Sequence, residues 1–262
     1  MEARKALLVT SFGTSHLDTL EKTIAATEQA IAAALPDYTL HRAFTSTIIM
    51  RKLKTRDGME IEDVPHALER LIREGYTQVV LQPTHILCGE EYDKLCALAA
   101  PYADRIPLSI GQPLLRTTED YWEVAKCIPD LLPAPAEDEA IVFMGHGSPH
   151  FANCSYALLQ YLLEDLGARR IYIGTVEGLP TLEQVMKRLK QDPAIRRIRT
   201  MPLMVVAGDH AKNDMAGPEE DSWKSQLEQA GYEVICILRG LGEFPAIQQL
   251  FARRALAAAD KL

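Results

Sequence analysis

Short runs of apolar residues alternate with longer amphipathic segments along the whole chain. The short runs predict strands at 6–10, 40–44, 78–82 and 106–110 in the first half, and at 140–144, 170–175, 198–205 and 232–238 in the second. Apolar residues at helical spacing predict helices between them, including 16–35, 64–74, 93–102, 121–132 and 245–262. Strands that alternate with helices form parallel sheets covered by helices. The predicted fold class is therefore α/β: two similar domains, each a four-stranded, mainly parallel sheet flanked by helices.

A proline-rich and acidic stretch at 133–139 is the strongest linker pattern in the chain. It predicts an N-terminal α/β domain over residues 1–132 and a C-terminal α/β domain over 133–262.

The two halves also match in detail. Residues 6–14 align with 140–148, which places Gly13 on Gly147 and Phe12 on His146. The spacing of Pro83 and Gly89 equals that of Pro202 and Gly208, and the same register places Glu91 on His210. This indicates a duplicated domain whose copies have diverged where they face a shared cleft. The alternative to a duplication is that the match reflects only the strand-then-glycine pattern that any two βα repeats share.

Three candidate metal ligands follow three predicted strands of the second half. His146 stands between two glycines after 140–144, Glu177 follows 170–175, and His210 follows the run that starts at 198. Parallel strands place ligands at their carboxyl ends, so these side chains are expected to share one site. Two imidazoles and a carboxylate suit divalent iron, cobalt, nickel or zinc, and imidazole also accepts protons near neutral pH. Two of the three residues also have a structural alternative to metal binding. His146 could be hydrogen-bonded within a tight turn, and Glu177 could be an acidic residue at the N-terminus of a helix.

The first half offers fewer candidates. Glu91 is expected to approach the site from the opposite wall, as a ligand, a proton acceptor or a solvated acid, and His85 lies on the same loop. The loop at 11–15 lacks the glycine patterns of nucleotide-binding loops. The basic residues between 51 and 56 form either a solvated helix face or partners for an anionic ligand. The other histidines are interpreted as bystanders: His16, His41, His66 and His150.

Charge and cysteine content narrow the function classes. The chain has 262 residues and a formal net charge of −8, which argues against generic binding of nucleic acids. Its five cysteines are widely spaced without a Cys-x-x-Cys pattern, which is typical of reduced thiols in a cytosol. The first apolar run, 6–10, is too short for a signal-peptide core or a membrane span. A cytoplasmic location without membrane partners is therefore expected.

Several segments resemble a known family, the single-subunit anaerobic cobalt chelatases of the CbiK type. The similar segments are 7–15, 42–46 with 51–53, His85 with 89–92, 142–147, 201–215 and 240–245. The resemblance covers essentially the whole chain. It implies a class II chelatase fold with a sirohydrochlorin-type substrate held between the domains. It also implies that His146 binds metal and accepts pyrrole protons, that Glu177 and His210 are further metal ligands, and that Glu91 is an active-site acid. The substrate-binding residues are expected to be Ser11, Phe12, Gly13, Thr14, His85 and Gly89.

The resulting hypothesis is a chelatase that inserts Co²⁺ into sirohydrochlorin or precorrin-2, with release of two protons, in anaerobic cobalamin synthesis. No permanently bound cofactor is expected; Co²⁺ is the substrate metal, and Fe²⁺, Ni²⁺ or Zn²⁺ are possible substitutes. Open alternatives are an iron-inserting chelatase, a non-catalytic tetrapyrrole or metal carrier, and a metallohydrolase. The sequence leaves open whether the chain forms a homo-oligomer and which basic residues meet the substrate carboxylates.

Overall fold

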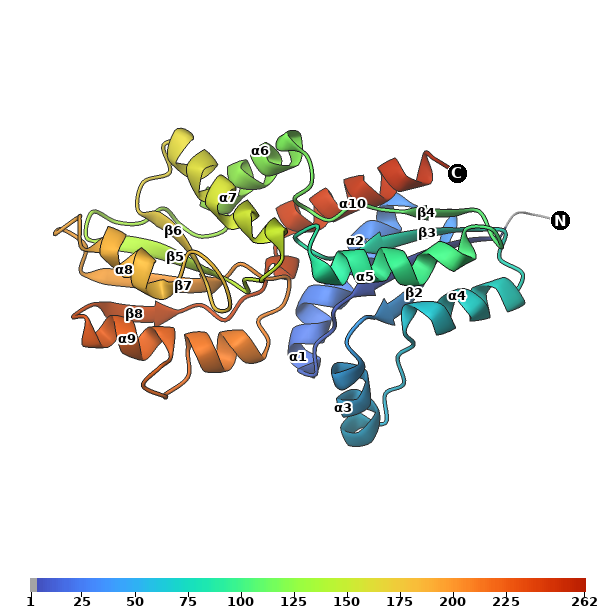
Figure 1. Cartoon of the computed structure of the whole chain (residues 1–262), viewed down its shortest axis with the longest axis horizontal. Helices are drawn as coiled ribbons and strands as arrows, with labels where there is room; N and C mark the ends of the chain where they lie inside the picture. The colour runs from blue at the N-terminus through green and yellow to red at the C-terminus, as the bar shows by residue number, and fades with distance from the viewer. Residues whose placement is uncertain (1–3) are drawn as a thin grey trace. The chain divides into compact units, whose positions relative to one another are not determined.

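A computed structural model describes residues 4–262, which form two compact units (Figure 1). The first unit runs to Arg116 and resumes at Pro245–Leu262, and the second is Thr117–Phe244. Residues 1–3, the start of the predicted N-terminal domain, lie outside the described residues. The predicted boundary after residue 132 thus falls inside the second unit, and the last helix belongs to the first unit instead of the second.

The proline-rich stretch at 133–139 does not mark the boundary between the units, because the backbone of this stretch is bound by residues of the second unit. Arg199 donates a hydrogen bond to the carbonyl of Pro133 over 2.7 Å, and Arg170 bonds the carbonyl of Glu137. Proline and small polar residues indicate irregular backbone, and irregular backbone is compatible with a fixed position inside a unit.

The first unit contains a parallel sheet with strand order β2-β1-β3-β4. Its strands are β1 (Lys5–Ser11), β2 (Tyr38–Phe44), β3 (Gln78–Pro83) and β4 (Leu108–Ile110). Its helices are α1 (Leu17–Thr19), the π-helix η1 (Leu20–Ala25), α2 (Ala26–Ala34), α3 (Thr47–Asp57), α4 (Val64–Arg73), α5 (Glu90–Ala99), the 3₁₀-helix η2 (Ala100–Tyr102) and α10 (Pro245–Ala259). The basic segment at 51–56 lies on α3.

Helices cover both faces of this sheet. The side chains of Ala6 and Leu8 on β1 share one core cluster with residues of α4 and α5. On the other face, α10 packs on α2 and β3 and buries Ile247 and Phe251 (Figure 1). This double burial explains why β1 is an uninterrupted apolar run. It also explains why α10 belongs to this unit.

The second unit repeats the plan with strand order β6-β5-β7-β8, again parallel. Its strands are β5 (Glu139–Gly145), β6 (Ile171–Thr175), β7 (Arg197–Pro202) and β8 (Glu233–Cys236). Its helices are α6 (Thr118–Cys127), η3 (Ile128–Asp130), η4 (Phe151–Asn153), α7 (Cys154–Asp165), α8 (Leu182–Leu189), the π-helix η5 (Ala211–Met215), α9 (Trp223–Gln229) and η6 (Leu241–Glu243). No helix within 4–262 has the length and apolar character needed to span a bilayer.

The predicted fold class and duplication are confirmed. The two sheets have the same strand order and the same register, since Thr10 pairs with Pro83 as Met144 pairs with Pro202. The largest error in a predicted strand end is at β7, which stops at Pro202, where the chain bends instead of continuing to residue 205. Leu203, the next residue, is 1% exposed, so the apolar run reflects burial beyond the strand. The strands β4 and β8 are also shorter than the predicted runs 106–110 and 232–238.

Candidate metal centre

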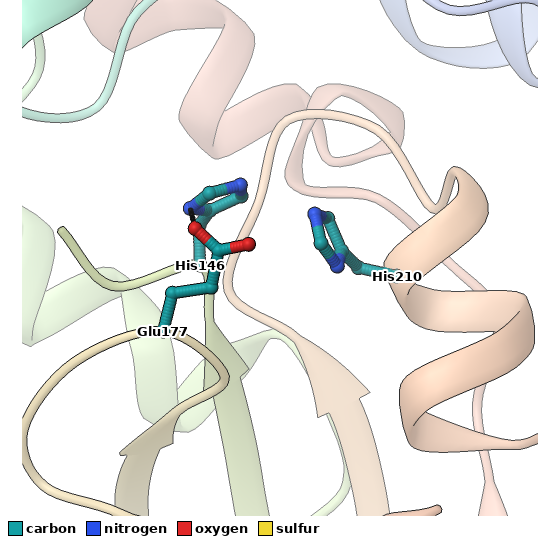
Figure 2. A group of neighbouring side chains, drawn as sticks. All are labelled: His146, Glu177 and His210. Carbon is teal, nitrogen blue, oxygen red and sulfur yellow. Dashed lines mark ion pairs between the residues drawn. The ribbon is translucent and has the colours of Figure 1, made fainter.

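Three side chains gather at the carboxyl edge of the second sheet. His146 directly follows β5, Glu177 lies on the turn after β6, and His210 stands at the start of the helical segment that contains η5 (Figure 2). One ligand atom from each residue lies within 4.8 Å of the others. Within residues 4–262 this is the one group of three or more such residues close enough to hold a single metal ion. The predicted convergence of the three residues is confirmed.

The two imidazole rings are oriented so that one nitrogen of each is available to the centre. The rings stand edge to face, with centroids 4.6 Å apart and planes at 86°. Nδ1 of His146 is 2.8 Å from the carbonyl oxygen of Gly147, and Nδ1 of His210 is 2.6 Å from Oδ2 of Asp214. Both partners are acceptors, so Nδ1 carries the proton in each neutral ring. The lone pair then lies on Nε2, the nitrogen that Figure 2 shows turned toward the other ring.

Glu177 is placed by backbone hydrogen bonds to the end of β5. Its N–H donates to the carbonyl of His146 over 2.8 Å, and Val176 N–H donates to Gly145 over 3.1 Å. Its Oε2 lies 3.8 Å from Nδ1 of His146, too long for a hydrogen bond, which leaves the carboxylate free to bind a cation. The side chains of His146, Glu177 and His210 are 47%, 55% and 35% exposed, so a ligand has open access.

Gly147 allows the Glu177 turn to come this close. Its φ is +86°, in the left-handed region, and a Cβ there would stand 2.4 Å from the backbone nitrogen of Gly178. Asn153 supports the same contact, because its Oδ1 accepts from Ser148 N–H at 3.0 Å and its amide donates to the carbonyl of Leu179. The glycine after the histidine therefore has a steric role.

His150 has a local structural role. Its Nδ1 accepts a hydrogen bond from Ala152 N–H over 3.2 Å at the start of η4. This contact caps a short helix and agrees with the prediction that His150 is a bystander.

The carboxyl edge of the first sheet carries a different set of polar residues. Ser11 and Thr84 share a hydrogen bond of 2.8 Å between their hydroxyls, and Thr45 donates to Oε2 of Glu91 over 2.8 Å. Thr45 directly follows β2, so it stands at a strand end of the first sheet. Ser11 and Thr14 are only 2% and 3% exposed, so their side chains shape the loop more than they offer contacts, whereas Phe12 is 49% exposed.

His85 lies on the same edge in an unusual environment. Both of its ring nitrogens are buried without a hydrogen-bond partner. Burial lowers the pKa of His85 to about 4, against an opposing effect from the charge of Glu91. The imidazole is therefore neutral near pH 7. The predicted substrate contacts of Ser11, Phe12, Gly13, Thr14, His85 and Gly89 stay predictions, as does the active-site role of Glu91.

Relatives of known type match the chain over nearly its whole length. A curated "Sirohydrochlorin cobaltochelatase" of Salmonella typhimurium is 43% identical over 253 residues, covering 95% of this chain and 94% of that protein. "Sirohydrochlorin cobaltochelatase CbiKC" of Nitratidesulfovibrio vulgaris is 34% identical over 263 residues, covering 99% and 92%.

Solved structures show the same fold at low sequence identity. SirB from Bacillus subtilis with Fe³⁺ superposes with a TM-score of 0.65 at 16% identity, covering 98% of this chain and 97% of that one. CbiX, described as the terminal enzyme of siroheme biosynthesis in denitrifying bacteria, gives a TM-score of 0.56 at 16% identity over 97% and 99%. The family model described as "Cobalt chelatase (CbiK)" matches residues 5–260. The chain belongs to the cobalt chelatase (CbiK) family.

Proposed function

We propose that this protein is a sirohydrochlorin cobaltochelatase, a metal chelatase that inserts Co²⁺ into sirohydrochlorin in cobalamin biosynthesis. The observation that carries the proposal is the convergence of His146, Glu177 and His210, with ligand atoms within 4.8 Å, in a chain of the CbiK family. The names of the two relatives support the choice of tetrapyrrole and metal.

The chemistry needs a place for the metal and acceptors for two protons. When Co²⁺ enters the macrocycle, two pyrrole N–H bonds break, four Co–N bonds form, and two protons leave; no electron is transferred. The open His₂-carboxylate set can hold the incoming cation while leaving coordination positions for ring nitrogens. As the metal moves to the macrocycle, Nε2 of His146 becomes free to accept a proton.

Glu91 is proposed as a further proton acceptor. Its Oε2 accepts the hydrogen bond from Thr45, and its Oε1 lies 3.8 Å from the ammonium group of Lys94. These two contacts fix the carboxylate without burying it, since the side chain is 36% exposed. A carboxylate in this setting can take up a proton and return it to solvent.

Co²⁺ is proposed as substrate, with no permanently bound cofactor. A His₂Glu set accepts several divalent metals, so Fe²⁺, Ni²⁺ and Zn²⁺ are proposed to bind as well. A cytoplasmic location is proposed on the same sequence pattern as before, five widely spaced cysteines without a Cys-x-x-Cys motif, which is typical of reduced thiols in a cytosol.

An anaerobic absorbance assay tests the function. Sirohydrochlorin is mixed with Co²⁺ or Fe²⁺ and with the wild type, His146→Ala, Glu177→Gln or His210→Ala. His66→Ala is the matched control, because His66 is an exposed imidazole on α4, 78% accessible and paired with Asp63. We expect enzyme-dependent Co²⁺ insertion that collapses in the three site variants and persists in the control.

Two outcomes would change the proposal. Faster insertion of Fe²⁺ than of Co²⁺ would indicate an iron chelatase on the same scaffold. No acceleration over the spontaneous reaction, with the tetrapyrrole still bound, would indicate a carrier.

A further inference from the structure

His210 has a carboxylate partner behind its ring. Asp214 lies four residues later, and its Oδ2 is 2.6 Å from Nδ1 of His210, a short charge-assisted hydrogen bond. Asp214 belongs to the π-helix η5 (Ala211–Met215), an element type that is rare and frequently found at functional sites. The contact lies on the side of the ring that does not face His146.

The hydrogen bond determines which nitrogen of His210 can bind a cation. A carboxylate only accepts, so Nδ1 must carry the proton, and the lone pair is confined to Nε2. Without this partner, a neutral imidazole would exchange between two tautomers and rotate about its side-chain bonds. The carboxylate also makes Nε2 a better donor to a metal, as in other carboxylate–histidine–metal arrangements.

His146 receives the equivalent support from the backbone. Its Nδ1 donates to the carbonyl oxygen of Gly147 over 2.8 Å. The two ligands are thus oriented by different means, a neutral carbonyl for His146 and a charged side chain for His210. Only the second can be removed by a side-chain substitution.

We propose that Asp214 is a positioning residue that orients His210 for the divalent cation and raises the affinity of the centre. The competing explanation is an ordinary helix-surface ion pair, of the kind formed by Glu183 and Lys187 at 2.9 Å on α8. Such exposed pairs contribute little to stability and nothing to metal binding. The inference uses the metal centre of the proposed function but does not depend on turnover.

The test is Co²⁺ binding to the full chain without tetrapyrrole, followed anaerobically by calorimetry and by the visible absorption of the Co²⁺ complex. The variants are Asp214→Ala and the isosteric Asp214→Asn. Glu220→Gln is the control for the loss of one negative charge, since Glu220 is an exposed acid in the same unit. We expect the Kd for Co²⁺ to rise about 10–100-fold in Asp214→Ala and less in Asp214→Asn, which retains an acceptor oxygen. Glu220→Gln should bind as the wild type does.

A second readout reports the tautomer directly. In the metal-free protein, ¹⁵N NMR of the His210 ring should show a protonated Nδ1 in the wild type and a mixture of tautomers in Asp214→Ala. A surface ion pair that only stabilises the helix would not produce this change. Circular dichroism and thermal melting of each variant establish that it is folded.

The outcomes separate this inference from the proposed function. Co²⁺ affinity within about twofold of wild type in Asp214→Ala, together with a loss in His210→Ala, would overturn the role of Asp214 and leave the function standing. Equal weakening by Glu220→Gln would also overturn it, because the effect would then be one of net charge. Weakened binding in Asp214→Ala without any insertion by the wild type would support Asp214 and overturn the chelatase.

Discussion

Glu91 and His210 occupy equivalent positions in two copies of one βα unit. Each stands eight residues after the proline that ends its strand, Pro83 in β3 and Pro202 in β7. Those strands pair in the same register with β1 and β5. One copy therefore has a carboxylate where the other has an imidazole of the candidate metal centre.

The other two candidate ligands also have counterparts in the first unit. Ser46 N–H donates to the carbonyl of Phe12 over 3.2 Å, just as Glu177 N–H donates to the carbonyl of His146 over 2.8 Å. Phe12 and Ser46 thus take the places of His146 and Glu177. An aromatic ring and a hydroxyl make a poor metal site, so of the two equivalent sheet edges only that of the second unit carries the candidate His₂-carboxylate set within the described residues.

Replacing Glu91 by Gln tests this division of roles. We expect the rate of Co²⁺ insertion to fall by about 10²-fold or more, the usual range for loss of a proton acceptor, while the Kd for Co²⁺ in the absence of tetrapyrrole stays unchanged. Glu90→Gln, the exposed acid one residue earlier on α5, is the control and should retain the rate. A parallel loss of Co²⁺ affinity in Glu91→Gln would instead make Glu91 a metal ligand.

The strands and the grouping of the three candidate ligands could be predicted because their causes are local. A strand buried on both faces must be apolar throughout, and parallel strands must bring their carboxyl ends to one edge. These two rules were enough to place His146 and Glu177 in one site.

The boundary between the units could not be predicted in this way, since α10 follows the second sheet in sequence and packs on α2 of the first unit. A hydrophobic pattern shows that α10 is amphipathic and does not show its partner.

The supporting residues could not be predicted for a similar reason. Asp214 is one of several polar residues after His210, and only the turn geometry of η5 shows that its carboxylate reaches Nδ1. The role of Thr45 is likewise recognised only from its hydrogen bond to Glu91 in the structure. Such partners are fixed by side-chain direction, which spacing along the chain specifies only loosely.

Substituting Gly147 should disrupt the metal centre through the backbone. In Gly147→Ala the new Cβ meets the backbone of Gly178 and Glu177, so the turn that carries Glu177 must move. We expect Co²⁺ affinity to fall at least about tenfold, as for a misplaced ligand. Gly167→Ala is the matched control: Gly167 also has a positive φ, +75°, but a Cβ there meets nothing within 4 Å. If both variants lose stability equally and both keep wild-type Co²⁺ affinity, the steric role of Gly147 is wrong.

Removing one partner of a buried ion pair should strongly destabilise the first unit. Arg42 donates two hydrogen bonds, of 2.7 and 2.6 Å, to the carboxylate of Glu28, whose side chain is 3% exposed. Glu28→Ala leaves the guanidinium without its partner, so we expect the free energy of unfolding to fall by about 3 kcal/mol. Because Arg42 is 29% exposed, water reduces part of this cost.

Urea denaturation of Glu28→Ala, Arg42→Met and the double variant measures the coupling. The double variant should be more stable than the sum of the single effects predicts, because no lone charge remains. Glu183→Ala on α8 breaks an exposed pair and should change the free energy of unfolding far less than Glu28→Ala does. Additive single effects in the Glu28 cycle would contradict a coupled buried pair.

His85 should make the protein less stable in acid. Burial lowers its folded-state pKa from 6.5 to about 4, and neither ring nitrogen has a hydrogen-bond partner. Between these two values the unfolded chain binds the proton and the folded chain does not, so stability is lost as the pH falls from 6.5 toward about 4. The full effect below that range is about 3 kcal/mol. We expect unfolding free energies from urea titrations at pH 7.5, 6 and 5 to decline less steeply in His85→Leu than in the wild type.

His66 is the contrasting case: its hydrogen bond to Asp63 raises the pKa of an exposed imidazole, so its contribution to stability is present in acid and lost as the pH rises. Identical pH slopes in the wild type and His85→Leu would show that His85 gains a proton in the folded state as readily as in the unfolded chain, and that its ring is not held neutral beside Glu91.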